Sequence, residues 1–194
     1  MPNLDLSSNL LHLKDKLALI PRPADSDHVE AVVAILLWDE PGRSLQTLLV
    51  QRAEREGDPW SGQIGLPGGR VKQAVESPRA ALHREVEEEV GIRLEEFGVE
   101  LGSLSVGHPM RRIEMRVRPW VYGLKIKPEV RLGSEIADSL WVNLLELPSK
   151  KKMSDITIRN QPWSVESYFV EGRVVWGFTY TVLTELLPIL EASL

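Results

Sequence analysis

The sequence predicts an α+β domain, or a layered αβα domain, in which strands outnumber helices. Short apolar and β-branched runs recur between turn-forming residues along the chain, as expected for strands. One amphipathic segment near the middle has helical periodicity, and a second helical segment closes the chain. Many strands around one central helix are typical of α+β and αβα architectures.

The chain begins with an amphipathic segment at residues 5–20, which predicts a helix rather than a signal peptide. Pro21 and Pro23 end this helix, and a polar linker follows. We therefore expect an N-terminal helix and linker at 1–27 and one domain at 28–194.

The domain opens with two predicted strands that are separated by the turn-forming run from Asp39 to Gly42. A last helix is expected at 179–192, where Pro188 allows a kink. The basic run at 150–152 is interpreted as a solvated loop. The predicted strands are 31–38, 46–51, 101–106, 113–124, 139–142, 165–170 and 174–178.

The composition excludes several classes of function. At 194 residues, with 43% hydrophobic and 26% charged residues, the chain is long enough for one globular domain with a substantial core. A net charge of −5 argues against broad nucleic-acid binding. The absence of cysteine excludes thiol catalysis, disulfides and thiolate zinc sites. Since no apolar run reaches membrane-spanning length, we expect no membrane partner and a cytoplasmic location.

The central helix is predicted at residues 77–91. Ser77 can cap its first turn, Pro78 suits the first helical position, and Gly91 can end it in a left-handed conformation. Apolar residues at i, i+4 and i+8 form a stripe that borders the acidic face of the same helix. The stripe consists of Leu82, Val86 and Val90.

Three glutamates, Glu85, Glu88 and Glu89, follow at i, i+3 and i+4, within an arc of about 100°. A Glu-rich helix is often a solvated surface, but these residues cluster near the C-terminus, where the helix dipole disfavours anions by about 0.3–1 kcal/mol each. Arg84 offers local relief, and a divalent cation would remove the conflict. The pattern therefore predicts a hard-oxygen site for Mg²⁺ or Mn²⁺, suited to metal-assisted hydrolysis of a diphosphate.

From Glu76 onward the chain reads E-x7-R-E-V-E-E-E-V-G-I. This resembles the Nudix box, G-x5-E-x7-R-E-U-x-E-E-x-G-U with U aliphatic. Gly69 and Glu76 are separated by six residues rather than five. The resemblance covers residues 30–190 and implies a Nudix-type αβα sandwich with a mixed β-sheet and a central metal-binding helix.

The one-residue extension is similar to that of the coenzyme A pyrophosphatase branch of the Nudix hydrolases. The chain departs from that branch at Val50, Leu66 and Lys72, and its loop between Arg52 and Gly62 is one residue longer. The segments that resemble the branch are 48–53, 62–69, 117–119, 135–142 and 175–179.

The resemblance implies that Glu85, Glu88 and Glu89 ligate Mg²⁺ or Mn²⁺, with the Gly68 carbonyl as a further ligand. Glu88, or a glutamate from another loop, would deprotonate the attacking water. Glu135 is a candidate for this base or for an extra ligand, and the alternative is a solvated loop residue.

Several cations are candidates around this site. Arg84 is expected to orient the glutamates through ion pairs. Arg52 could grip a phosphate, or be an ordinary surface arginine at a strand end. Arg111 and Arg112 lie in a predicted loop and could bind a nucleotide phosphate, or be a solvated basic pair. Trp60 could stack on a base, whereas the other tryptophans are read as core.

The leading hypothesis is a diphosphatase that acts on a small-molecule nucleotide, a nucleoside diphosphate linked to another moiety, with coenzyme A or acyl-coenzyme A favoured. ADP-ribose, another nucleotide sugar or a dinucleoside polyphosphate is the alternative substrate. A nucleotide-sensing module without catalysis is the alternative outside the enzymes; it predicts a damaged glutamate set, and all three glutamates are present. Relatives also suggest a homodimer.

Overall fold

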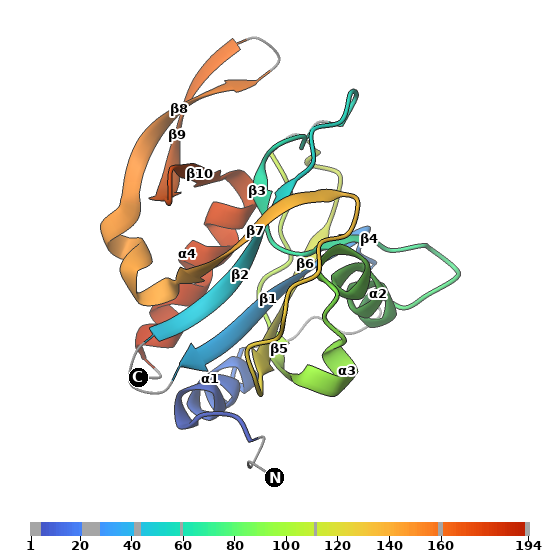
Figure 1. Cartoon of the computed structure of the whole chain (residues 1–194), viewed down its shortest axis with the longest axis vertical. Helices are drawn as coiled ribbons and strands as arrows, with labels where there is room; N and C mark the ends of the chain where they lie inside the picture. Colours follow the sequence, from blue (N-terminus) through green and yellow to red (C-terminus); the bar gives the residue numbers. More distant parts are fainter. Residues whose placement is uncertain are drawn as a thin grey trace.

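The computed structural model describes residues 5–20, 28–40, 44–58, 60–110, 112–158 and 161–192. A mixed sheet forms the centre of the molecule, and a smaller three-stranded sheet lies beside it (Figure 1). The helices are α1 Ser8–Ala18, α2 Pro78–Val90, α3 Leu94–Phe97, the 3-10 helix η1 Leu144–Lys150 and α4 Gly177–Glu191. The strands are β1 Ala31–Glu40, β2 Ser44–Arg52, β3 Ile64–Gly65, β4 Gly68–Arg70, β5 Gly98–Ser103, β6 Val117–Leu124, β7 Ile136–Asn143, β8 Lys151–Ile158, β9 Gln161–Val170 and β10 Arg173–Trp176.

Strand β1 organises the central sheet, whose main path is β3-β2-β1-β6-β5, with β4 paired to β1 and β7 paired to β2. It runs antiparallel to β2 and β4 but parallel to β6, from Ala31 opposite Val117 to Leu37 opposite Gly123. The sheet is therefore mixed, as predicted, and the α+β class is confirmed.

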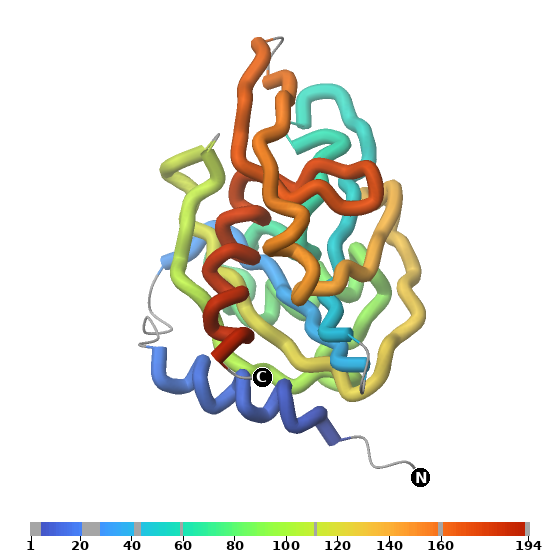
Figure 2. The backbone as a smooth tube through the Cα atoms, turned by 90° about the vertical axis from the view of Figure 1, so that its left-hand side faces the viewer, coloured from blue at the N-terminus to red at the C-terminus, as the bar shows by residue number. Residues whose placement is uncertain are grey.

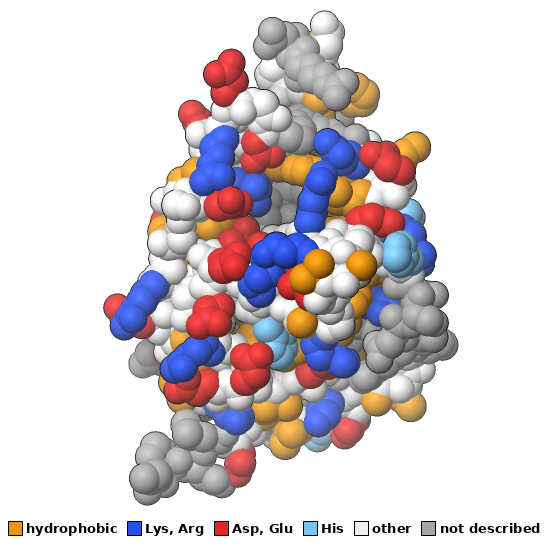
Figure 3. All heavy atoms as spheres, turned by 90° about the vertical axis from the view of Figure 1, so that its right-hand side faces the viewer, with side chains coloured by type: hydrophobic (Ala, Val, Ile, Leu, Met, Phe, Trp, Pro, Cys, Tyr) orange, Lys and Arg blue, Asp and Glu red, His pale blue; other side chains and the backbone are white. Residues whose placement is uncertain are grey.

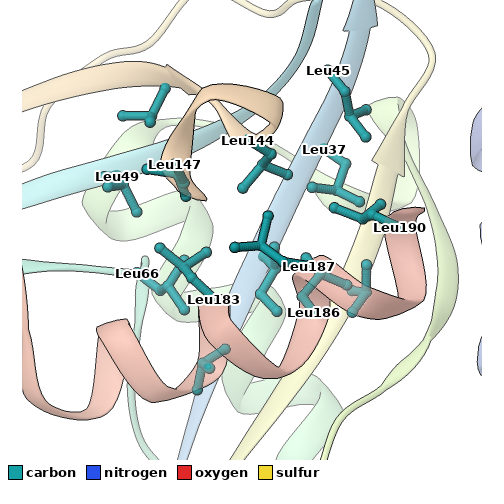
Figure 4. Close-up of a cluster of buried hydrophobic side chains, with 14 of the residues drawn as sticks. Leu37, Leu45, Leu49, Leu66, Leu144, Leu147, Leu183, Leu186, Leu187 and Leu190 are labelled. Carbon is teal, nitrogen blue, oxygen red and sulfur yellow. The ribbon is translucent and has the colours of Figure 1, made fainter. Parts of the chain in front are cut away.

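Alternation along β1 sends its side chains into two separate cores. Val32, Ala34 and Leu36 face the core beneath α2, whereas Ile35 and Leu37 face the core beneath α4. Figure 4 shows the second core, in which leucines from β1, β2, η1 and α4 point toward one another. Helices α2 and α4 thus cover opposite faces of the sheet, which gives the αβα layering.

Helix α1 packs its amphipathic face against the domain. Its buried residues are Leu10, Leu13 and Leu17, and they join the core beneath α4. The helix begins at Ser8 rather than at residue 5, because the Ser7 hydroxyl accepts a hydrogen bond from the Leu10 N–H at 3.3 Å and caps the first turn. Figure 2 shows α1 lying across one end of the molecule, close to the end of α4. The predicted linker at 21–27 lies outside the described residues.

All seven predicted strands are present, but each differs from its predicted range at one or both ends, and the strand expected at 101–106 lies at 98–103. Two of these differences have a clear local cause. The strand expected from residue 113 begins at Val117, since the Met115 N–H donates to the Arg112 carbonyl in a turn. The strand expected to reach residue 178 ends at Trp176, because Gly177 adopts a φ of 61° and begins α4. Pro188 lies within α4.

The predicted solvated loop at 150–152 is wrong in its backbone, because Lys151 and Lys152 open strand β8. Their side chains are exposed as expected, and Lys151 Nζ lies 3.0 Å from Glu166 on the neighbouring strand. Neither β8 nor η1 was predicted. No helix in the described ranges is long and apolar enough to cross a membrane.

Candidate functional site

Helix α2 forms between the signals that the sequence predicted. The Ser77 hydroxyl accepts a hydrogen bond from the Ala80 N–H at 3.2 Å, and Pro78 occupies the first turn. At the other end, Gly91 is left-handed with a φ of 70°, and its N–H donates to the Glu87 carbonyl at 2.9 Å. Ala81, Leu82, Val86 and Val90 are buried, so the rotation of the helix about its axis is fixed by packing.

The glutamate face of α2 lies against strand β4. A Cβ built on Gly69 would stand 2.4 Å from the Glu85 carboxyl carbon, so only glycine leaves room for this carboxylate. Gly68 is equally confined, with a φ of 149° and the Val32 carbonyl 2.2 Å from a built Cβ. The two glycines thus allow α2 and β1 to approach β4 closely.

A loop at 131–135 closes the C-terminal end of α2. The Arg131 N–H donates to the Val90 carbonyl and the Gly133 N–H to the Glu89 carbonyl, both at 2.9 Å. These N–H groups pair with carbonyls at the C-terminal end of α2. Without such partners, the partial negative charge of the carbonyls would repel the glutamates more strongly. The same loop places Glu135 beside the end of the acidic face.

Arg84 joins four oxygen-bearing groups around the acidic face. Its Nε and Nη2 donate to the two oxygens of Glu76, at 3.0 and 2.7 Å. Its Nη1 donates to Glu85 at 2.8 Å and to Glu88 at 3.2 Å, and Nη2 also reaches the Arg70 carbonyl at 3.2 Å. The Arg84 hydrogen bonds lower the pKa of Glu76 to about 2, and these carboxylates raise the pKa of Arg84. Arg84 therefore contacts Glu76, Glu85 and Glu88 together, and its role in orienting the glutamates stays a prediction.

Glu89 is the buried member of the three helix glutamates, with 4% of its surface exposed. Its Oε2 accepts a hydrogen bond from the Gly68 N–H at 2.8 Å, and its Oε1 lies 3.5 Å from Arg52 Nη1. Burial raises the pKa of Glu89 to about 7, although the Gly68 and Arg52 contacts favour the charged form. The site therefore holds a carboxylate whose negative charge is only partly compensated.

Arg52 lies among three carboxylates. It is 3.3 Å from Asp58 through Nε, 3.5 Å from Glu89 through Nη1 and 3.7 Å from Glu135 through Nη2. Arg55 adds a second cation, with Nη1 3.1 Å from Glu135 and Nη2 donating to the Ser134 carbonyl at 3.0 Å. Arg55 and Asp58 were not singled out from the sequence. The signal that could have identified them is the lengthened loop after Arg52, which carries both.

One pocket of about 770 Å³ brings these groups together. Of the predicted residues, Arg52, Gly68, Arg84, Glu85, Glu88, Glu89 and Glu135 line it. In Figure 3, acidic and basic side chains surround a hollow that contains hydrophobic atoms. Trp60 also lines the pocket, and the Arg112 guanidinium carbon lies 5.8 Å from the centre of the Trp60 ring. Arg111 lies outside the described residues.

The donor set fits a hard divalent cation, because it consists of carboxylates on one helix face and one of them is buried with incomplete compensation. Within the part of the chain that the structure describes, no three carboxylate or imidazole groups already converge on one point. Arg84 instead bridges Glu85 and Glu88, and Arg52 faces Glu89. Ligation of one ion by all three glutamates therefore stays a prediction.

The chain is 34% identical over 106 residues to an uncharacterized protein of Schizosaccharomyces pombe. The aligned segment covers 52% of this chain and 32% of that protein. The chain thus matches about a third of the length of that relative.

The chain is also similar to solved structures, one of which has a TM-score of 0.50 and shows the same fold. A MutT/nudix family protein from Enterococcus faecalis has a TM-score of 0.50 and 20% identity, over 86% of this chain and 63% of that chain. The MutT protein from Methanosarcina mazei has a TM-score of 0.48 and 26% identity, over 62% of this chain and 80% of that chain. The family model of the NUDIX domain matches residues 27–161, which is more than half of the chain. This protein therefore belongs to the NUDIX family.

Proposed function

We propose that this protein hydrolyses a diphosphate linkage in a nucleoside diphosphate joined to another moiety, with Mg²⁺ or Mn²⁺ as cofactor. The observation that carries the proposal is a single pocket lined by the acidic face of α2, by Glu135 from a separate loop, and by Arg52 between them. Carboxylates on two sides of a cavity, with a cation between them, suit an anionic substrate that is bound together with a divalent ion.

A divalent ion held on the acidic face would supply positive charge to the diphosphate and make water more acidic. Glu88 is the most exposed of the three helix glutamates, with 59% of its side-chain surface accessible, so it can accept a proton from an attacking water. Glu135, with 53% of its side-chain surface accessible, is the alternative base across the pocket. Arg84 orients Glu85 and Glu88, and Arg52 can turn from the carboxylates to a phosphate oxygen.

Coenzyme A or acyl-coenzyme A is the favoured substrate in this proposal. The support is the resemblance of the chain to the coenzyme A pyrophosphatase branch, including the six-residue spacing between Gly69 and Glu76. Within this segment Ala74 adopts a φ of 64°, and the Lys72 N–H donates to Glu76 Oε1 at 2.9 Å. Glu76 consequently still meets Arg84. ADP-ribose, other nucleotide sugars and dinucleoside polyphosphates would use the same acidic face and are the alternative substrates.

The test is product release from a panel of these compounds with Mg²⁺ or Mn²⁺. We expect a nucleoside monophosphate portion and a second phosphorylated fragment, and a loss of turnover by orders of magnitude in Glu88→Gln. Glu87→Gln is the matched control, because Glu87 is an exposed glutamate of α2 that does not line the pocket. Equal rates in the two variants would reject the role of Glu88. Binding of these compounds without any product would instead identify a sensing module.

A further inference from the structure

Strand β8 forms one edge of the smaller sheet, whose strand order is β10-β9-β8. Within the described ranges its eight residues pair with β9 alone, so the backbone groups on its outer side meet no other strand. In Figure 1 the hairpin of β8 and β9 projects from the molecule, and β8 lies on the side away from the central sheet. Such an edge is a template on which a further strand can pair.

Lysines at a sheet edge often prevent pairing between molecules, but the two lysines of β8 contact side chains of their own sheet. Lys151 Nζ lies 3.0 Å from Glu166 Oε1 on the neighbouring strand. Lys152 Nζ lies 3.5 Å from the centre of the Phe169 ring, which also belongs to β9. Because both lysine side chains extend toward β9, the edge beyond them stays open to another strand.

The charge pattern of β8 decides how a second copy of the strand can pair with it. Opposite residues of a sheet share a face, so a strand that pairs antiparallel with its own copy about a twofold axis is centred on one residue. Centring on Lys152 or on Asp155 places like charges opposite each other, and centring on Ser154 places no charges opposite each other. Centring on Met153 places Lys151 of each copy opposite Asp155 of the other, which forms two pairs of opposite charge.

We propose that β8 pairs with β8 of a second copy of this chain, antiparallel and centred on Met153, so that two three-stranded sheets join edge to edge. Met153 is 59% exposed in the single chain, and its two copies would contact each other at the centre of the interface. Removal of this apolar surface from water adds to the backbone hydrogen bonds between the strands. Neither Met153 nor the two charged partners Lys151 and Asp155 line the pocket, so the interface is independent of the proposed function.

The chain contains no cysteine, so single cysteine variants report the register directly. Met153→Cys should form a disulfide-linked dimer under mild oxidation, because opposite residues of an antiparallel pair have Cα atoms about 4.5–5.5 Å apart, within disulfide reach. Thr157→Cys is the matched control, since Thr157 is exposed and lies on the same face of β8 as Met153. In the proposed register its two copies are too far apart to form a disulfide.

Charge reversal tests the same register without an added cysteine. Asp155→Lys and Lys151→Glu should each weaken dimerisation about 10-fold or more in analytical ultracentrifugation, because each variant places like charges opposite each other twice. An equimolar mixture of the two should dimerise about as strongly as the wild type, since both pairs are then opposite in charge. Glu87→Lys is the control, because it makes the same change of charge as Asp155→Lys on an exposed residue of α2.

The proposal is overturned if the wild-type protein sediments as a monomer at every concentration, in which case any occupant of the edge is a strand of another protein. It is also overturned if Met153→Cys and Thr157→Cys cross-link equally, or if neither charge reversal weakens a dimer that the wild type forms. A mixture that stays monomeric has the same meaning where both variants melt at the wild-type temperature. If either variant melts lower, the cysteine cross-link decides alone.

Discussion

Replacing Glu89 by glutamine should stabilise the metal-free protein at pH 8. Glu89 is buried, and its pKa is raised from 4.5 to about 7 in the folded state. A carboxyl group with a raised pKa binds more protons folded than unfolded, so the free energy of unfolding falls as pH rises from about 4.5 to 7. Above pH 7 the full penalty of the buried charge is present, and glutamine avoids it while still accepting a hydrogen bond from the Gly68 N–H.

The shift corresponds to about 3 kcal/mol, at about 1.4 kcal/mol for each pH unit. The Arg52 contact at 3.5 Å is already included in this shift, because it lowers the pKa that burial raises. For a chain of this size a stabilisation of about 3 kcal/mol raises the melting temperature by roughly 6–12 °C.

The assay is thermal unfolding in EDTA at pH 5 and pH 8 for wild-type protein, Glu89→Gln and the exposed control Glu87→Gln. The difference between Glu89→Gln and wild type should be large at pH 8 and small at pH 5. The control should follow the wild type at both values. A Glu89→Gln variant that melts at or below the wild-type temperature at pH 8 would refute the reasoning. It would show that burial of the ionised Glu89 carboxylate does not destabilise the folded state.

Three further outcomes follow from contacts in the structure. Arg84→Lys should lower kcat by about 10- to 100-fold, because lysine cannot hold Glu85 while bonding Glu76 through two nitrogens; steady-state kinetics checks this. Gly69→Ala should displace the Glu85 carboxylate, whose carbon would stand 2.4 Å from the new methyl carbon, and lower turnover by about 10-fold or more in the same assay. Leu13→Ala should reduce the free energy of unfolding by about 2–5 kcal/mol in urea titration, because the side chain is fully buried. An unchanged midpoint would show instead that α1 is independent of the domain.

The central helix was predictable because its signals are local. A serine cap, an early proline and a terminal glycine fix its bounds, and the apolar stripe fixes which face is buried. The three glutamates then follow from spacing alone. How their charges are compensated was not predictable. Arg52 and the loop at 131–135 come from distant parts of the chain, and the pairing of β2 with β7 brings them to α2.

The elements missed by sequence reasoning lack such local signals. Strand β4 reads Gly68-Gly69-Arg70, with no β-branched or aromatic residue, and it is a strand because it pairs with the start of β1. Strand β8 begins with two residues of a basic run typical of a loop, yet every residue of the strand pairs with β9. In both cases tertiary pairing outweighs composition.

Strand β1 contributes to both sides of the pocket, because its side chains alternate between α2 and the cluster that contains Trp60. A slip of one position against β6 would exchange the residues that β1 turns toward α2 with those that it turns toward Trp60. The pocket would then lose its acidic lining and its apolar lining in the same event. Damage to this strand should therefore remove both properties together, whereas damage to a loop can remove either one alone.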